Sequence, residues 1–290
     1  MKASAIPELD RMMELADGRT LAWSEWGDLG GRPVVLLSGT PGSRLCCPDV
    51  DATEAAGVRL ITIDRPGYGR SDPRPGLTTL SWVDDYVELV DHLALPPCPV
   101  VGWSGGGAYA LASGYRLPGR VTSVGLAATP GPMTGPPGFL DDFSPEGRAN
   151  IELFRRDRAA GIEAIARRRE TFRGDVWQGF SAGVFPEADA PLLARSDVQE
   201  TMRTYLNESA RQGPVGWVDD DIAEATGDGF SIAEIQPEVH IWIGGVDDWV
   251  PRSHADHMVE MIPRTTLVSF PSGGHLFPFE HWAEMLAALH

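Results

Sequence analysis

Short apolar runs alternate with longer amphipathic stretches along the first half of the chain. Four of these runs begin at Val34, Val58, Pro99 and Val121. Each has the length and continuous apolar character of a buried strand, whereas the segments between them show the longer hydrophobic period of a helix. This alternation predicts a parallel sheet whose strands are joined by right-handed helical crossovers. Strand patterns return only at Val239 and Thr265.

The pattern changes after the fourth of these runs. A Pro- and Gly-rich stretch follows Pro132, and the residues beyond it have mostly helical periodicity. The simplest organisation is an α/β core made of residues 1–132 and 237–290, interrupted by a helical insertion at residues 133–236. We therefore expect an α/β fold with a mostly parallel central sheet, flanking helices and a helical cap formed by the insertion.

Composition excludes several classes of function. The formal net charge of −17 argues against nucleic-acid binding, which needs clustered Lys and Arg. Lys2 is the only lysine, so Schiff-base chemistry, a phosphate-loop lysine and a Ser-Lys dyad are practically excluded. The three cysteines have neither the number for a disulfide framework nor the spacing of a zinc site.

The hydrophobic pattern also bears on location. No run approaches the length of a membrane-spanning helix, and the N-terminal residues have acids where a signal peptide needs an apolar centre. We expect a cytoplasmic protein that acts on a small molecule and binds neither membranes nor nucleic acid. The sequence leaves its oligomeric state open.

A single serine lies between glycines at the end of one predicted strand. The apolar run from Pro99 stops at Ser104, and a helical pattern begins just after it. A turn this abrupt forces its central residue into a strained conformation and leaves no room for side chains two residues away, where the sequence has Gly102 and Gly106. This Gly-x-Ser-x-Gly pattern between a strand and a helix is typical of the nucleophile elbow of serine hydrolases.

A serine nucleophile needs a base and a group that orients the base, both on loops at the carboxyl ends of strands. His275 lies on a Gly-Gly turn after the last predicted strand, whereas the other histidines lie within helical or strand patterns. The preceding strand ends at Gly244 and is followed by Asp247 and Asp248. Either aspartate is a candidate for the orienting acid, and the order Ser, Asp, His suits this kind of fold.

Five motifs in order give the chain a resemblance to the α/β-hydrolase superfamily over essentially its whole length. They are SGTPGS from Ser38, DRPGYGRSD from Asp64, GWSGG from Gly102, G-x-x-D-x-x-V-P from Gly244 and GGH ending at His275.

The resemblance implies a role for particular residues. It selects Asp247 over Asp248 as the acid of a triad with Ser104 and His275. It also implies an oxyanion hole formed by the backbone N–H groups of Thr40 and Gly105. One departure is visible, because many relatives begin the oxyanion loop with His-Gly and this chain has Ser-Gly there.

The expected function is that of a serine hydrolase, without metal or cofactor, that cleaves carboxylic esters through an acyl-enzyme. A helical insertion of this size is expected to select the substrate rather than to break bonds. Because the insertion is rich in aromatic residues, we expect a small and largely apolar substrate, with Trp103 and Trp217 as candidate pocket residues.

Two main alternatives remain, and a third is cofactor-free oxygenase or lyase chemistry on the same scaffold. The first is an aminopeptidase resembling proline iminopeptidases, in which one of Asp219, Asp220 and Asp221 holds a substrate ammonium; these acids could instead stabilise a helix N-terminus. The second is a hydrolase-like binding protein that keeps the pocket without turnover.

Overall fold

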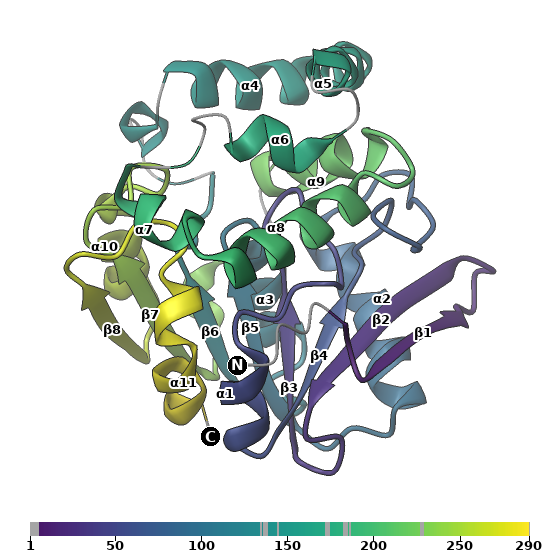
Figure 1. Cartoon of the computed structure of the whole chain (residues 1–290), viewed down its shortest axis with the longest axis vertical. Coiled ribbons are helices and arrows are strands. Elements are labelled where there is room, and N and C mark those ends of the chain that lie inside the picture. Colours follow the sequence, from purple (N-terminus) through teal and green to yellow (C-terminus); the bar gives the residue numbers. More distant parts are fainter. Residues whose placement is uncertain are drawn as a thin grey trace.

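In the computed structural model, the described residues form one mixed sheet with helices on both faces and a group of helices over one edge (Figure 1). The structure describes residues 6–133, 135, 139–143, 145–171, 175–181, 185, 187–226 and 229–289. The sheet has eight strands in the order β1-β2-β4-β3-β5-β6-β7-β8. Their bounds are Leu9–Glu14 (β1), Thr20–Gly27 (β2), Arg32–Leu37 (β3), Val58–Ile63 (β4), Cys98–Trp103 (β5), Val121–Ala127 (β6), Glu238–Gly244 (β7) and Thr265–Phe270 (β8).

The six predicted strands are β3 to β8, and every pairing among them is parallel. This confirms the α/β fold class and the mostly parallel sheet. The antiparallel strands β1 and β2 are additional. β1 is largely exposed, and β2 buries Ser24 and Glu25 among its apolar residues, with Glu25 accepting a hydrogen bond from Arg59. Buried polar residues interrupt the apolar run by which the other strands are recognised.

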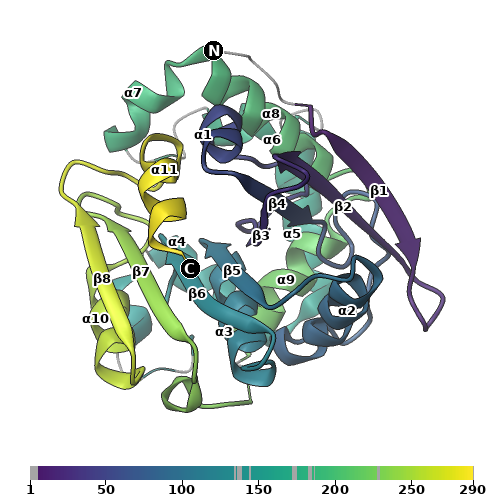
Figure 2. The ribbon, with the colours of Figure 1, turned by 90° about the horizontal axis from the view of Figure 1, so that it is seen from below.

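Helices of the core cover both faces of the sheet (Figure 2). Their bounds are Val50–Ala55 (α1), Thr79–His92 (α2), Gly106–Arg116 (α3), Arg252–Met261 (α10) and Pro278–Ala288 (α11). One hydrophobic cluster lies between the sheet and helices α2, α3 and α10. A second lies between the other face of the sheet and helices α1 and α11, and it extends to buried residues of the chain between β6 and β7. Burial of both faces explains why strands β3 to β7 are apolar along most of their length, whereas the edge strand β8 is partly exposed.

The described part of the chain between β6 and β7 is mostly helical. Its helices are Pro145–Arg156 (α4), Arg158–Thr171 (α5), Val176–Ser181 (α6), Ala190–Leu193 (α7), Ser196–Ser209 (α8) and Val215–Ala225 (α9), with short 3₁₀ turns at Phe139–Asp142, Glu187–Asp189 and Ile232–Glu234. Helices α4 to α9 lie over the upper edge of the sheet in Figure 1. The limits 133–236 of the insertion stay a prediction. None of the helices in the described part of the chain is long and apolar enough to span a bilayer.

Candidate active site

Ser104 lies on the tight turn between β5 and α3. Its φ of +52° is in the left-handed region, which residues other than glycine seldom adopt and which occurs most often at functional turns. The backbone N–H of Ser104 donates to the carbonyl oxygen of Ala127 at 2.8 Å and fixes the turn against the next strand. The hydroxyl is thus held at the carboxyl end of a strand in the middle of the sheet.

The glycines on either side of Ser104 are required by close backbone contacts. A Cβ atom at Gly102 would lie 2.4 Å from Cα of Gly107, and one at Gly106 would lie 2.1 Å from the carbonyl oxygen of Leu37. Both positions therefore accept only a residue without a side chain. The steric explanation of the Gly-x-Ser-x-Gly pattern agrees with this packing.

His275 and Asp247 are joined by a hydrogen bond at the carboxyl ends of β8 and β7. Nδ1 of His275 lies 2.9 Å from Oδ2 of Asp247, and the two side chains are 4% and 2% exposed. The other carboxylate oxygen of Asp247 accepts the backbone N–H groups of Trp249 and Val250. An Nδ1–H that donates to Asp247 leaves Nε2 as a proton acceptor, as a general base requires. The neighbouring Asp248 is exposed.

The electrostatics of this pair favour an ionised acid and a basic imidazole. Burial raises the pKa of Asp247, but the charge of His275 and the hydrogen bond from it outweigh this effect and hold the pKa below its usual value. Burial lowers the pKa of His275, but the charge of Asp247 and its hydrogen bond reverse the effect, with smaller contributions from Asp189 and Asp248, so the pKa is raised.

Ser104 and His275 line the same cavity, which has a volume of about 80 Å³. Its other walls are mainly apolar side chains from the core and from the insertion: Pro41, Trp103, Phe180, Phe185, Met202, Leu206 and Trp249. Trp103 also donates its indole N–H to the carbonyl oxygen of His275 at 3.3 Å. It therefore both lines the cavity and supports the loop that carries the histidine.

Thr40 and Gly105 lie beside Ser104. Gly105 immediately precedes α3, so its backbone N–H is at the end of the helix where donors have no intrahelical partner and the helix dipole is positive. Thr40 lines the cavity with Ser104, and a Cβ atom at Gly105 would lie 2.4 Å from Oγ1 of Thr40. The two residues expected to form an oxyanion hole are therefore neighbours in space.

A buried carboxylate from the insertion is bonded to the loop that carries Thr40. Asp220, on α9, is fully buried and accepts hydrogen bonds from Arg65 and from the hydroxyl groups of Tyr68 and Tyr109. Arg65 also donates to the carbonyl oxygens of Ser38 and Gly39. Asp220 and Arg65 thus connect the insertion to the loop between β3 and α1.

Asp219 and Asp221, the sequence neighbours of Asp220, have different surroundings. Asp219 forms an ion pair with Arg158, whereas Asp221 lines a second cavity. The alternative that these acids stabilise a helix N-terminus is wrong. Helix α9 begins at Val215, so all three acids follow its first turn and point into packed or cavity-lining positions instead.

The second cavity adjoins the first and has a volume of about 300 Å³. The two share Thr40, Phe180 and Trp249. Trp217 lines this second cavity rather than the cavity at Ser104. Its ring stacks on that of Phe180, with 5.9 Å between the ring centroids. Two carboxyl groups, those of Asp221 and Glu224, complete a wall that is otherwise largely aromatic and aliphatic.

Glu224 is a site residue that the sequence analysis missed. Its Oε1 lies 2.6 Å from Oγ1 of Thr40, and Oδ2 of Asp220 lies 2.6 Å from the same hydroxyl. A hydroxyl has one hydrogen to donate, so the two carboxyl groups compete for the Thr40 hydroxyl. Burial, together with the charges of Glu224 and Asp220, raises the pKa of Asp221 well above its usual value. The spacing of Asp220, Asp221 and Glu224 along one helical face was the signal for this cluster.

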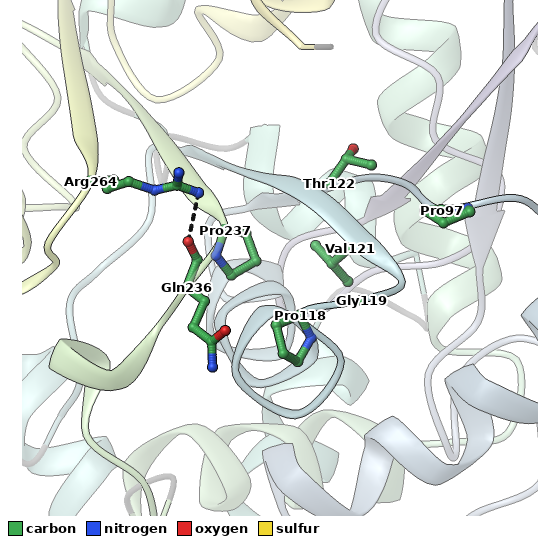
Figure 3. A pocket seen from close by; sticks show the side chains of 8 residues that line it. All are labelled: Pro97, Pro118, Gly119, Val121, Thr122, Gln236, Pro237 and Arg264. Carbon is green, nitrogen blue, oxygen red and sulfur yellow. Dashed lines mark hydrogen bonds between the residues drawn. The ribbon is translucent and has the colours of Figure 1, made fainter.

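Figure 3 shows a larger cavity, of about 510 Å³, which shares no lining residue with the two cavities beside Ser104. It is lined by Pro97, Pro118, Gly119, Val121, Thr122, Gln236, Pro237 and Arg264, around the amino ends of β5, β6 and β7. Ligands of open parallel sheets bind at the carboxyl ends of the strands. The smaller cavities beside Ser104 are therefore the better candidate for an active site.

Comparison with known proteins assigns this fold and motif order to one family. A model of the alpha/beta hydrolase family matches residues 34–289. The chain belongs to this family.

Individual relatives differ in what they do. The chain is 28% identical over 271 residues to the dihydrolipoyllysine-residue acetyltransferase component of an acetoin cleaving system from Pseudomonas putida, covering 91% of this chain and 64% of that protein. It is 33% identical over 117 residues to a proline iminopeptidase from Arabidopsis thaliana, covering 39% of this chain and 31% of that protein. The alignments thus span less than two thirds of these two relatives.

Among solved structures, an esterase from Exiguobacterium antarcticum superposes with a TM-score of 0.66. The two chains are 24% identical, and the match covers 97% of this chain and 98% of the esterase. At this level of identity the likeness bears on the fold alone.

Proposed function

We propose that this protein is a serine hydrolase that cleaves carboxylic esters of small, largely apolar substrates. The observation that carries the proposal is the hydrogen-bonded pair of His275 and Asp247 beside a cavity that Ser104 also lines. The apolar walls and the small volume of that cavity suit a compact acyl group.

The chemistry follows from the roles of these residues. Nε2 of His275 takes the proton of Ser104 as Oγ attacks the ester carbonyl, and Asp247 stabilises the imidazolium that forms. The N–H groups of Thr40 and Gly105 bind the oxyanion. The imidazolium gives its proton to the leaving alkoxide. Water, deprotonated by His275, then attacks the acyl carbonyl, and the imidazolium returns a proton to Oγ of Ser104 as the acid leaves.

A fluorophosphonate tests the nucleophile. Intact mass after incubation should show one adduct, and peptide mapping should locate it on Ser104. Wild-type protein that hydrolyses p-nitrophenyl esters but stays unlabelled would contradict the proposal. The same assays test the binding-protein alternative, which requires ligand binding with neither turnover nor labelling.

The proposal includes a cytoplasmic location and catalysis without a metal. The first is tested by fractionation of the cells that make the protein. The second is tested by dialysis against a chelator, which should leave ester hydrolysis unchanged, whereas loss of activity that added metal restores would overturn it.

A second candidate is an aminopeptidase, favoured by Asp221 and Glu224 in the cavity that adjoins Ser104. A carboxylate there could bind a substrate ammonium, as the similarity to a proline iminopeptidase also suggests. The test compares p-nitrophenyl esters with proline and alanine arylamides in wild type and in Asp221→Asn.

The two candidates predict opposite results. An esterase should process the uncharged esters far better, and Asp221→Asn should change kcat/KM by less than about twofold. An aminopeptidase should prefer the arylamides and lose about a hundredfold or more in Asp221→Asn, because the ammonium loses a buried partner. Asp219→Asn is the matched control, since Asp219 is paired with Arg158 and does not line the cavity.

A further inference from the structure

A second carboxylate of the insertion is bonded to the loop that carries His275. Asp189 ends the 3₁₀ turn Glu187–Asp189 and is fully buried. Its Oδ2 accepts the backbone N–H of His275 at 3.0 Å, and its Oδ1 accepts the backbone N–H of Leu276 at 2.9 Å. The two oxygens of one carboxylate therefore hold two successive amides of the loop between β8 and α11.

The Gly-Gly turn before His275 has the shape needed to admit this side chain. A Cβ atom at Gly274 would lie 2.3 Å from Oδ1 of Asp189. A glycine at position 274 thus makes room for a carboxylate that comes from a distant part of the chain. The Gly-Gly-His motif is fitted to the insertion as well as to the sheet beneath it.

The chemistry of the contact favours a carboxylate. An Asn at position 189 would offer one acceptor oxygen, and its NH₂ group would face the second N–H. Burial raises the pKa of Asp189, and the hydrogen bond from Leu276 and the charge of His275 offset this effect only in part. The negative charge of Asp189 also raises the pKa of His275, as the charges of Asp247 and Asp248 do.

We propose that Asp189 is a positioning residue, which holds the His275 loop so that the imidazole meets both Asp247 and the cavity lined by Ser104. The proposal rests on the proposed hydrolase function. It gives the insertion a part in the catalytic apparatus in addition to substrate selection. A misplacement of the imidazole by about 1 Å is enough to lower a rate by about a hundredfold.

The test compares Asp189→Asn with Glu187→Gln, a change at an exposed residue of the same 3₁₀ turn. We expect Asp189→Asn to lower kcat for p-nitrophenyl acetate by about ten- to a hundredfold with KM nearly unchanged, because the base is misplaced while the cavity remains. Glu187→Gln should behave as wild type. The charges that face His275 are those of Asp247, Asp248 and Asp189, so loss of one of them should lower the imidazole pKa and move the acid limb of kcat/KM to lower pH.

A merely structural role would not move that acid limb. Folded Asp189→Asn with wild-type kcat and an unshifted acid limb would overturn the proposal. If Asp189→Asn does not fold, Gly274→Ala provides the second variant, because it displaces the carboxylate and keeps its charge. It should lower kcat, and wild-type kcat in Gly274→Ala would equally overturn the proposal.

The role of Asp189 can be tested even if the hydrolase proposal fails. That proposal fails when the wild type neither turns over esters nor reacts with a fluorophosphonate. The His275 imidazole can still be titrated by NMR in wild type and Asp189→Asn, with His275→Gln to assign the signal. A lower pKa in Asp189→Asn supports the positioning role, and an identical titration contradicts it.

Discussion

The core and the insertion contribute to the site in different ways. The core supplies the proposed nucleophile, acid and base, Ser104, Asp247 and His275, and each follows the end of a parallel strand. The insertion supplies two buried carboxylates, those of Asp189 and Asp220. They accept hydrogen bonds from core loops that are distant from them in sequence. Reactive groups are thus fixed by the sheet, while the loops that hold them are fixed in part by the insertion.

The largest expected effect is on the core side. Ser104→Ala should lower kcat for p-nitrophenyl esters by on the order of 10⁶-fold, because no other group would attack the carbonyl. Steady-state kinetics with highly purified protein measure it. Full activity in this variant would place the nucleophile elsewhere.

Substitution of the orienting acid should have the next largest effect. Asp247→Asn should lower kcat by about 10⁴-fold, because the imidazole loses its preferred tautomer and the charge that stabilises its cation. The adjacent Asp248→Asn is the matched control and should stay within about twofold of wild type. The reverse order of the two variants would transfer the role to Asp248.

On the insertion side, the expected effect is on stability. Asp220→Asn leaves the buried Arg65 without its charged partner, so the free energy of unfolding should fall by about 3–5 kcal/mol in denaturant titrations. Asp219→Asn removes an ion pair whose Arg158 is 51% exposed, and should cost less than about 1 kcal/mol. Equal costs for the two variants would remove the distinction between a carboxylate paired with a buried arginine and one paired with an exposed arginine.

The smallest expected effect is a displacement of the pH profile. Ser104 is activated only by neutral His275, so kcat/KM should be full above the histidine pKa and fall as the pH drops through it. Because this pKa is raised by Asp247, Asp189 and Asp248, the acid limb should lie above the value of about 6.5 for an unperturbed imidazole. An acid limb below that value would contradict the described surroundings of His275.

The contrast between the two regions also explains what the sequence could predict. Strands β3 to β7 are largely buried and so have long apolar runs, and Ser104 and His275 lie within glycine-rich turns whose signals extend over a few residues. These features are local, and the six strands and the elbow were predicted from them.

The features that the sequence analysis missed depend on contacts between distant residues. β2 is a strand because it is buried between β1 and β4, although Ser24 and Glu25 interrupt its pattern. No local pattern in the sequence marks Asp189, because its contact is with the backbone N–H of His275, a residue distant in sequence. Glu224 had a helical-spacing signal, but its neighbour Thr40 comes from the far end of the chain.

The central claim, that Ser104 carries the acyl group during turnover, is tested most directly by trapping the intermediate. A p-nitrophenyl ester is mixed with the protein, quenched in acid during the steady state, and the protein is analysed by intact mass and peptide mapping. The account predicts a mass increase equal to one acyl group, located on Ser104 and absent from Ser104→Ala. Acylation of another residue in the active wild type would contradict it.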